Sequence, residues 1–202
     1  MSSIVGHILG GAVAAKAAAG EILPEQRRRF YALAALTSLL PDLDVIVFML
    51  FRPLEMTPHR GASHSLLFAA ISALLLTFLC ARFFSFARGR LFACIFAAYG
   101  SHLVLDYLMG CGPEVLFFWP FSAQGYLAPI QLVPTAYYGL SANAFLAVIL
   151  SSATYVGIAL ELLIFVPLLY LSTAKTWSQS APLLLLTVAG ILTTAALYNG
   201  AT

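Results

Sequence analysis

The chain has 202 residues, of which 61% are hydrophobic and 9% are charged, and its mean hydropathy is +0.94. Soluble domains carry about 25% charged residues, so this chain has too little polar surface to cover a water-soluble globule. A net charge of +2, spread over scattered basic residues, argues against nucleic acid as a partner. These values predict an all-α integral membrane protein in which residues 1–202 form a single membrane-embedded helical domain.

Six apolar runs follow one another along the chain, and most approach the roughly 20 residues that a helix needs to cross a bilayer. They cover residues 4–20, 30–51, 64–86, 91–109, 141–172 and 181–199. The first run is short and rich in Ala and Gly, which suits packing inside a bundle. The run 141–172 is long enough for an interfacial helix followed by a span, or for one long tilted helix. No alternating pattern of a membrane barrel is visible, so the sequence predicts about six transmembrane or membrane-embedded helices.

Basic residues between the runs predict the orientation of the bundle. If all six runs cross, the connections on one side carry Arg27, Arg28, Arg29, Arg82, Arg88, Arg90 and Lys175. The positive-inside rule makes that side cytoplasmic, although Arg52 and Arg60 fall on the opposite side. The expected location is a bacterial inner membrane crossed several times, with both termini and the segment 110–140 outside.

Ionisable residues interrupt the apolar runs in five clusters. They are His7; Asp42 and Asp44 in LLPDLD; His59 and His64 in HRGASHS; His102 and Asp106 in SHLVLD; and Glu161 in ALELL. An ionisable group in a membrane helix costs about 2.5–3.5 kcal/mol on insertion scales, so such groups mark functional sites by default. In the six-span topology the His and Asp clusters all reach the outer layer of the membrane. The charge rule that sets this orientation does not use them.

Local spacing refines these clusters. His102 and Asp106 are four residues apart and share one helix face. Asp42 and Asp44 point to different faces if they are helical, but Pro41 disfavours helix at the preceding residue, so a local break can aim both inward. The alternative is that one of the two carboxylates is a ligand and the other a supporting partner or helix cap.

The residue types predict a divalent metal site. The candidate ligands are His7, Asp42, Asp44, His59, His64, His102 and Asp106. Nitrogen and carboxylate ligands suit zinc first, with manganese or iron as alternatives. This set exceeds the needs of one tetrahedral zinc, which favours two ions, or one ion beside a carboxylate base. Ser63 is the expected cap of the third span, with His64 in its first turn and His59 on the preceding loop.

Other residues are candidates for catalysis or for the wall of the site. Asp42 or Asp44 can serve as the general base, and Arg60 is either a lipid-headgroup contact or a clamp for a substrate phosphate. Glu161 is a catalytic group, a ligand or a structural partner. Interfacial aromatic residues are expected at Tyr99, Tyr107, Trp119, Tyr137 and Tyr138, and Trp119 with Pro120 can alternatively wall the site.

The motifs GHILGG, LLPDLD, HRGASHS, SHLVLD and FWPFS occur in this order over about residues 1–122 and resemble the YdjM-type family of inner-membrane metal-dependent hydrolases. The resemblance implies a membrane-bound metal-dependent hydrolase. The C-terminal helices, residues 141–199, match only as apolar helices that carry Glu161.

A more distant resemblance is to the helical zinc phospholipase C and P1-nuclease type, which takes zinc ligands from an early His, an Asp, a later His and a His-xxx-Asp helix. It implies ligand roles for His7, Asp42 or Asp44, His59 or His64, His102 and Asp106, with Asp106 bridging two ions. The chain departs from that type because it lacks a second group of two His and one Glu, and because its N-terminus is not a Trp ligand.

The leading hypothesis is hydrolysis of a phosphoester by a metal-activated water at the outer membrane face. Membrane lipids are the expected partners, and a lipid or lipid-linked molecule is the expected substrate. One alternative is a metal-ion transporter or sensor, which predicts ligands through the whole membrane depth and an inverted repeat. Another is a closed structural metal site in a membrane interaction protein. One-sided clustering and the lack of a sequence repeat favour the hydrolase.

Overall fold

The computed structural model describes residues 3–44, 60–134, 150–172 and 177–199. Within these residues the chain forms six α-helices and no β-strand, with one isolated bridge between Val115 and Tyr126. The helices are α1 (Ile4–Ala19), α2 (Arg27–Leu39), α4 (Leu66–Cys80), α5 (Arg88–Leu108), α7 (Ser152–Leu171) and α8 (Trp177–Asn199). The all-α class expected from the sequence is confirmed.

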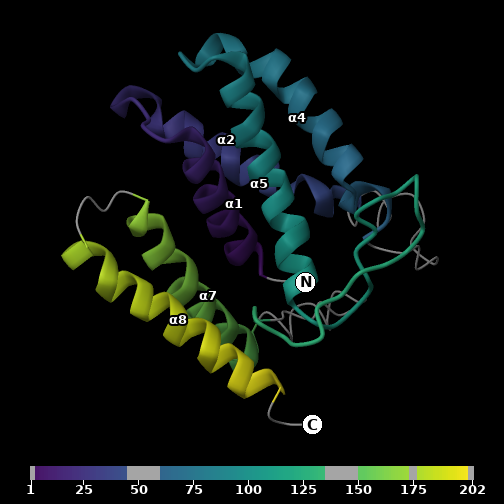
Figure 1. Cartoon of the computed structure of the whole chain (residues 1–202), viewed down its shortest axis with the longest axis vertical. Helices are drawn as coiled ribbons and strands as arrows, with labels where there is room; N and C mark the ends of the chain where they lie inside the picture. Colours follow the sequence, from purple (N-terminus) through teal and green to yellow (C-terminus); the bar gives the residue numbers. More distant parts are fainter. Residues whose placement is uncertain (1–2, 45–59, 135–149, 173–176, 200–202) are drawn as a thin grey trace.

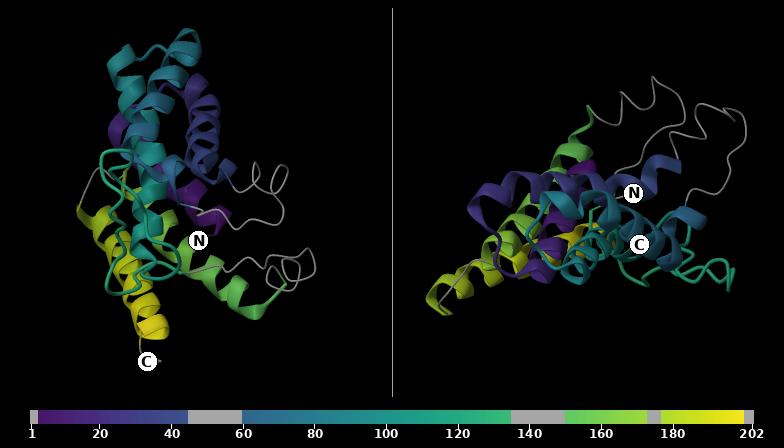
Figure 2. Two further views of the ribbon diagram at one scale, coloured as in Figure 1. Left: turned by 90° about the vertical axis from the view of Figure 1, so that its right-hand side faces the viewer. Right: turned by 90° about the horizontal axis from the view of Figure 1, so that it is seen from above.

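The helix α5 is the centre of the bundle. It contacts α1, α2 and α4, while α7 packs against α1 and α8 packs against α7. The α7–α8 pair and α4 therefore lie on opposite sides of the central helices (Figure 1), and the left view of Figure 2 shows the same separation. All the elements that carry the His and Asp clusters belong to the group around α5.

Serine side chains begin three of the helices. The hydroxyl of Ser3 accepts from the Gly6 amide at the start of α1, and Ser65 accepts from the Phe68 amide at the start of α4. Ser151 caps α7 in the same way. Such caps satisfy amide groups that have no partner within the helix. The expectation of a cap at Ser63 is wrong, because residues 62–64 form a short 3-10 turn that ends before α4 begins.

Four helices are long and apolar enough to cross a membrane. They are Leu66–Phe83, Arg88–Leu108, Ser152–Leu171 and Ser178–Asn199. The helix α1 has 16 residues and α2 has 13, so the first two apolar runs give shorter helices. The run expected over 30–51 is interrupted after Leu39 by the 3-10 turn Leu40–Asp42, which confirms the predicted break at Pro41.

Apart from Arg60, the basic residues in the described part of the chain gather at the end of the bundle opposite the His and Asp clusters. Exposed arginines there are Arg27, Arg28, Arg29, Arg82, Arg88 and Arg90. Gln26 joins the two basic connections, since its side-chain amide donates to the Ser85 hydroxyl over 2.8 Å. The placement of this end in the cytoplasm stays a prediction from the positive-inside rule. Arg52 and Lys175 lie outside the described residues.

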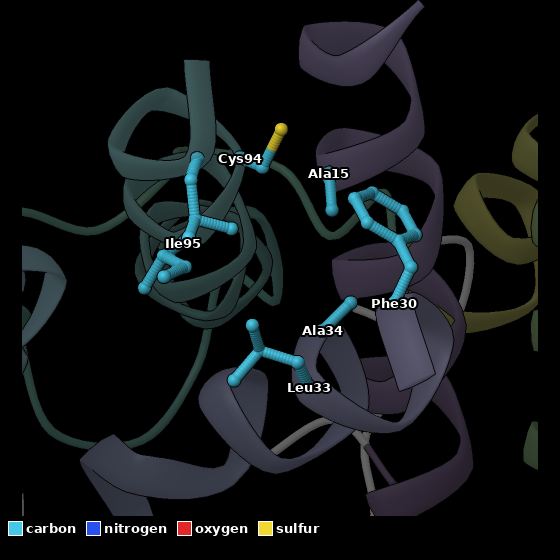
Figure 3. Close-up of a pocket in the computed structure, with 7 residues that line it drawn as sticks. Ala15, Phe30, Leu33, Ala34, Cys94 and Ile95 are labelled. Carbon is cyan, nitrogen blue, oxygen red and sulfur yellow. The ribbon is translucent and has the colours of Figure 1, made fainter. Parts of the chain in front are cut away.

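A small pocket between α1, α2 and α5 has an apolar lining (Figure 3). Its walls are Ala15, Phe30, Leu33, Ala34, Leu91, Cys94 and Ile95. The lining contains no charged side chain and no hydroxyl group, and most of it belongs to the buried core. It is therefore a packing feature of the bundle rather than a place for chemistry.

Candidate metal centre

The sequence clusters converge at one end of the bundle. His7 lies near the start of α1, Asp42 and Asp44 follow α2, His64 ends the turn before α4, and His102 and Asp106 lie in the last turns of α5. The side chains of His7, His64, His102 and Asp106 are completely buried. His59, the remaining predicted ligand, lies outside the described residues, as do Tyr137 and Tyr138.

Four ligand atoms form the heart of the cluster: Nε2 of His64, Nε2 of His102, Oδ1 of Asp42 and Oδ2 of Asp106. The two nitrogens are 3.2 Å apart. Nε2 of His64 lies 3.7 Å from the Asp42 oxygen and 3.4 Å from the Asp106 oxygen. Nε2 of His102 lies 3.3 Å and 3.7 Å from the same two atoms. Ligands about 2.0–2.1 Å from a tetrahedral zinc ion are about 3.3–3.4 Å apart, and these five separations are close to that value.

The hydrogen bond at the far side of His102 fixes the state of its ring. Nδ1 of His102 lies 2.7 Å from the carbonyl oxygen of Ser38. A carbonyl oxygen only accepts hydrogen bonds, so Nδ1 carries the proton and donates. In the neutral ring Nε2 then holds a lone pair, and this lone pair faces the cluster.

A chain of two hydrogen bonds fixes His64 in the same way. The hydroxyl of Ser63 donates its one hydrogen to Oδ2 of Asp44 over 2.8 Å. Towards Nδ1 of His64, 3.0 Å away, the Ser63 oxygen must therefore accept. His64 donates from Nδ1 and presents the lone pair of Nε2 to the cluster. Asp42 is thus the candidate ligand of the LLPDLD motif, and Asp44 is the partner that orients Ser63 and His64.

The electrostatics of this arrangement favour either a bound metal ion or an added proton. Burial alone would raise the pKa of Asp42, but a hydrogen bond from His102 and the positive charge of that ring when it is protonated keep this pKa below its ordinary value. When both rings are neutral, two nitrogen lone pairs and two carboxylate oxygens face one another. Repulsion among such atoms is strong in a medium of low dielectric constant. It is relieved by a metal ion, or by a proton on one of the two rings.

His7 lies beside this group of four atoms. Its ring stacks on His102 with a centroid separation of 3.7 Å, and its Nε2 lies 3.7 Å from Oδ1 of Asp106. Within the described part of the chain, neither ring nitrogen of His7 makes a hydrogen bond, although both are buried. A buried ring nitrogen normally has a hydrogen-bond partner, such as a water molecule, or binds an ion.

Two groups of residues can each hold an ion: His7 with His102 and Asp106, and Asp42 with His64 and His102. His102 belongs to both, and it has only Nε2 to offer because Nδ1 is bonded to Ser38. One lone pair binds one ion. The two groups therefore form a single centre rather than two separate sites.

Arg60 is fully committed to contacts inside the protein. Its side chain is 1% exposed, and Nε lies 3.0 Å from Oδ2 of Asp106. Nη1 donates to the carbonyl oxygens of Pro113 and Cys111, and Nη2 contacts the sulfur of Met109. These contacts occupy the faces of the guanidinium that a substrate phosphate would need. The arrangement favours a role in holding Asp106 against the loop that follows α5.

Glu161 lies in α7 and contacts the start of α1 instead of the His and Asp cluster. Its carboxylate accepts from the Ser3 amide over 2.8 Å and from the Ser3 hydroxyl. A carboxylate at a helix N-terminus is stabilised by the helix dipole. Because the His7 amide donates to the Ser3 carbonyl, this contact fixes the turn of α1 that carries His7.

The supporting roles of several groups in the site were not predicted from the sequence. Tyr99 is 1% exposed and donates to the Ser63 carbonyl over 2.6 Å, so it is a buried support of the HRGASHS turn and not an interfacial aromatic residue. The Ser63 hydroxyl has a signal in the sequence, since it lies beside His64. The Ser38 carbonyl has none, because every residue has a carbonyl group.

The fold and this cluster define a class: a multi-helix membrane protein with a buried His/Asp centre at one end of its bundle. The chain belongs to the YdjM inner membrane protein family, whose profile it matches over residues 1–196. This match extends the resemblance expected over about residues 1–122 into the C-terminal helices.

The chain is also similar to the inner membrane protein YbcI of Escherichia coli strain K12. The two are 33% identical over 105 residues, which are 52% of this chain and 61% of that protein. The matched part thus spans about three fifths of the relative. No solved structure matches the chain, so the distant likeness to phospholipase C and P1 nuclease has no structural match behind it.

Proposed function

We propose that this protein is a membrane-bound metal-dependent hydrolase that cleaves a phosphoester of a lipid or lipid-linked substrate. The observation that carries the proposal is the set of four ligand atoms on Asp42, His64, His102 and Asp106, in which each ring nitrogen lies 3.2–3.7 Å from the other three atoms. Imidazole nitrogen and carboxylate oxygen suit zinc, with manganese or iron as alternatives. A divalent ion held there would polarise a phosphoryl oxygen and lower the pKa of a nearby water.

Charge balance supports a divalent ion. The centre contains the carboxylates of Asp42, Asp44 and Asp106 and the guanidinium of Arg60. With neutral imidazole rings, these groups leave a net charge of two negative units, which one divalent cation cancels. A neutral assembly is the least costly one to bury beside a membrane.

The least buried members of the centre indicate where a substrate enters. The side chains of Asp42 and Asp44 are 15% and 13% exposed, whereas those of His64, His102 and Asp106 are completely buried. A substrate therefore approaches over the two aspartates. Asp44 bonds to Ser63 rather than to the heart of the cluster, which leaves it suited to accept a proton as the general base.

The same observations weigh against the two rival functions. A transport path needs ligands through the membrane depth, while the described histidines lie at one end of the bundle and Glu161 is bonded to Ser3. A structural site is closed on all sides, while Asp42 and Asp44 reach the surface. The arginines at the opposite end support an extracytoplasmic location of the centre under the positive-inside rule.

The test measures metal content and hydrolysis on the same preparations. Purified full-length protein is loaded with Zn²⁺, Mn²⁺ or Fe²⁺, analysed by elemental mass spectrometry, and assayed for release of phosphate or headgroup from phospholipid vesicles. We expect the double variant His102→Ala, Asp106→Ala to lose both the ion and the activity. Glu25→Ala, which removes an exposed carboxylate at the other end of the bundle, keeps both.

Three results would overturn parts of the proposal. Equal activity of the loaded wild type and the double variant removes the catalytic role of the centre. A bound ion with no hydrolysis of any phosphoester supports a structural site. Metal flux across proteoliposomes that depends on His102 supports transport.

A further inference from the structure

The loop that follows α5 carries an exposed aromatic tip. In the stretch LFFWPFS, residues 116–122, the side chains of Phe118, Trp119 and Phe121 are 48%, 36% and 84% exposed. Phe121 is the most exposed large hydrophobic side chain in the described part of the chain. Large apolar groups on a loop, away from the lipid-facing surface of any helix, indicate an interaction surface.

Three backbone amides of this tip are already hydrogen-bonded. The Trp119 amide donates to the Leu116 carbonyl over 3.1 Å. The Phe121 and Ser122 amides both donate to the Phe118 carbonyl, over 2.9 Å and 3.1 Å. Pro120 has no amide hydrogen to satisfy. An unpaired backbone group is costly in an apolar medium. The hydrogen bonds of these amides therefore lower the cost of moving the tip from water into lipid.

The base of the loop is also closed, and its tip is uncharged. Val115 and Tyr126 exchange amide–carbonyl hydrogen bonds of 2.9 Å and 3.1 Å. Glu114 lies at the base of the loop beside Gly125, and no Asp, Glu, Lys or Arg occurs from residue 115 to residue 134. The aromatic tip itself therefore carries no charged residue of the kind that would favour a protein partner or exposure to water.

The loop is fastened to the ends of two membrane spans. It follows α5 directly, and its Phe117 carbonyl accepts from the amide of Leu66, the first residue of α4, over 2.9 Å. Figure 1 shows the segment passing beside the start of α4. His64 lies two residues before Leu66, so the loop and the metal centre share one rigid attachment.

We propose that residues 115–126 form an interfacial anchor, in which Phe118, Trp119 and Phe121 insert into the lipid leaflet at the site end of the bundle. A lipid surface is the occupant because the tip is continuous with the ends of two spans, is uncharged, and carries the aromatic residues that membrane interfaces favour. The anchor sets the depth of the metal centre at the headgroup layer. It depends on the membrane location and not on the hydrolase proposal.

The two tryptophans of the chain, Trp119 and Trp177, allow a direct test. The variant Trp177→Phe keeps the loop intact and leaves Trp119 as the only tryptophan. It is reconstituted into phosphatidylcholine vesicles whose acyl chains are brominated either near the headgroup or near the chain end. We expect Trp119 to lose most of its emission to the shallow bromines, less to the deep ones, and little to iodide in the water. Trp119→Phe reports Trp177 as the reference.

Two outcomes would overturn the anchor. Quenching by iodide but not by brominated lipid places the tip in water. Resistance to both quenchers means that protein covers the tip, from a second copy or another partner. Metal content of the same Trp177→Phe samples, compared with wild type, verifies the fold. The failure of the anchor would leave the metal and hydrolysis assays unaffected, so the two proposals stand or fall separately.

Discussion

Nε2 of His64 lies 3.2 Å from Nε2 of His102, and the other nitrogen of each ring faces an acceptor, the Ser63 hydroxyl for His64 and the Ser38 carbonyl for His102. The hydrogen bond at Nδ1 therefore orients each ring, so that the lone pairs of the two Nε2 atoms face each other. Metal-binding histidines are commonly held in this way, with the second ring nitrogen donating to an oxygen. One of these acceptors is a side-chain hydroxyl and the other is a backbone carbonyl.

Replacing Ser63 tests the orientation of His64. Ser63→Ala removes the acceptor for Nδ1 and separates His64 from Asp44, so the ring loses its fixed tautomer. We expect Zn²⁺ affinity, measured by chelator competition, to fall by about 10–100-fold. Ser172→Ala is the matched control, because its hydroxyl donates to the nearby Leu169 carbonyl. Unchanged affinity in Ser63→Ala would show that the hydroxyl does not orient a ligand.

The shared use of His102 predicts one ion per chain. We expect titration with Co²⁺, followed by visible absorption and elemental analysis, to saturate at a single equivalent. His102→Ala removes an atom common to both groups of ligands and abolishes binding of the ion. His7→Ala leaves the four ligand atoms of Asp42, His64, His102 and Asp106 in place, so it weakens binding of the ion less. Binding of two equivalents by the wild type, with His7→Ala binding one, would contradict the single centre.

The helical class and the convergence of the clusters were predictable because both follow from polarity. Ionisable residues are so unfavourable in apolar runs that their positions stand out, and alternating helix directions bring them to one end. The break at Pro41 was predictable because proline restricts the residue before it. The different roles of Asp42 and Asp44 were not predictable, because they depend on the long-range hydrogen bond from Ser63 to Asp44.

Other features of the site depend on tertiary contacts that leave no local pattern. Ser63 and Ser65 are equally good helix caps by type, and only the 3-10 turn at residues 62–64 decides between them. Glu161 looks the same in the sequence as a ligand or a structural partner. Its contact with Ser3 joins positions that are 158 residues apart.

Removing the Glu161 carboxylate separates a supporting role from ligation. Glu161→Ala leaves the Ser3 amide without its acceptor at a buried helix start, a loss of about 1–3 kcal/mol. We expect a lower thermal unfolding temperature in detergent, while the Co²⁺ spectrum of the loaded protein keeps its shape. Glu161→Gln retains one acceptor oxygen and recovers part of the stability. Loss of the ion in Glu161→Ala, as complete as in His102→Ala, would instead make Glu161 a ligand.

A pair of glycine substitutions tests how closely α1 must approach α2. A Cβ atom added at Gly11 would lie 2.5 Å from the Cβ of Ser38 and 3.2 Å from the Ala34 carbonyl oxygen. Gly11→Ala therefore pushes the two helices apart and displaces the Ser38 carbonyl that holds His102. We expect both the unfolding temperature and Zn²⁺ affinity to fall.

The matched control is Gly100→Ala in α5, where an added Cβ meets nothing within 4 Å. Replacing glycine by alanine inside a helix stabilises it by roughly 0.5–1 kcal/mol, so this variant should unfold at the same temperature or higher and keep its affinity. If Gly11→Ala loses stability but binds Zn²⁺ like the wild type, the Ser38 carbonyl has enough freedom to follow His102. The close approach at Gly11 would then serve packing alone.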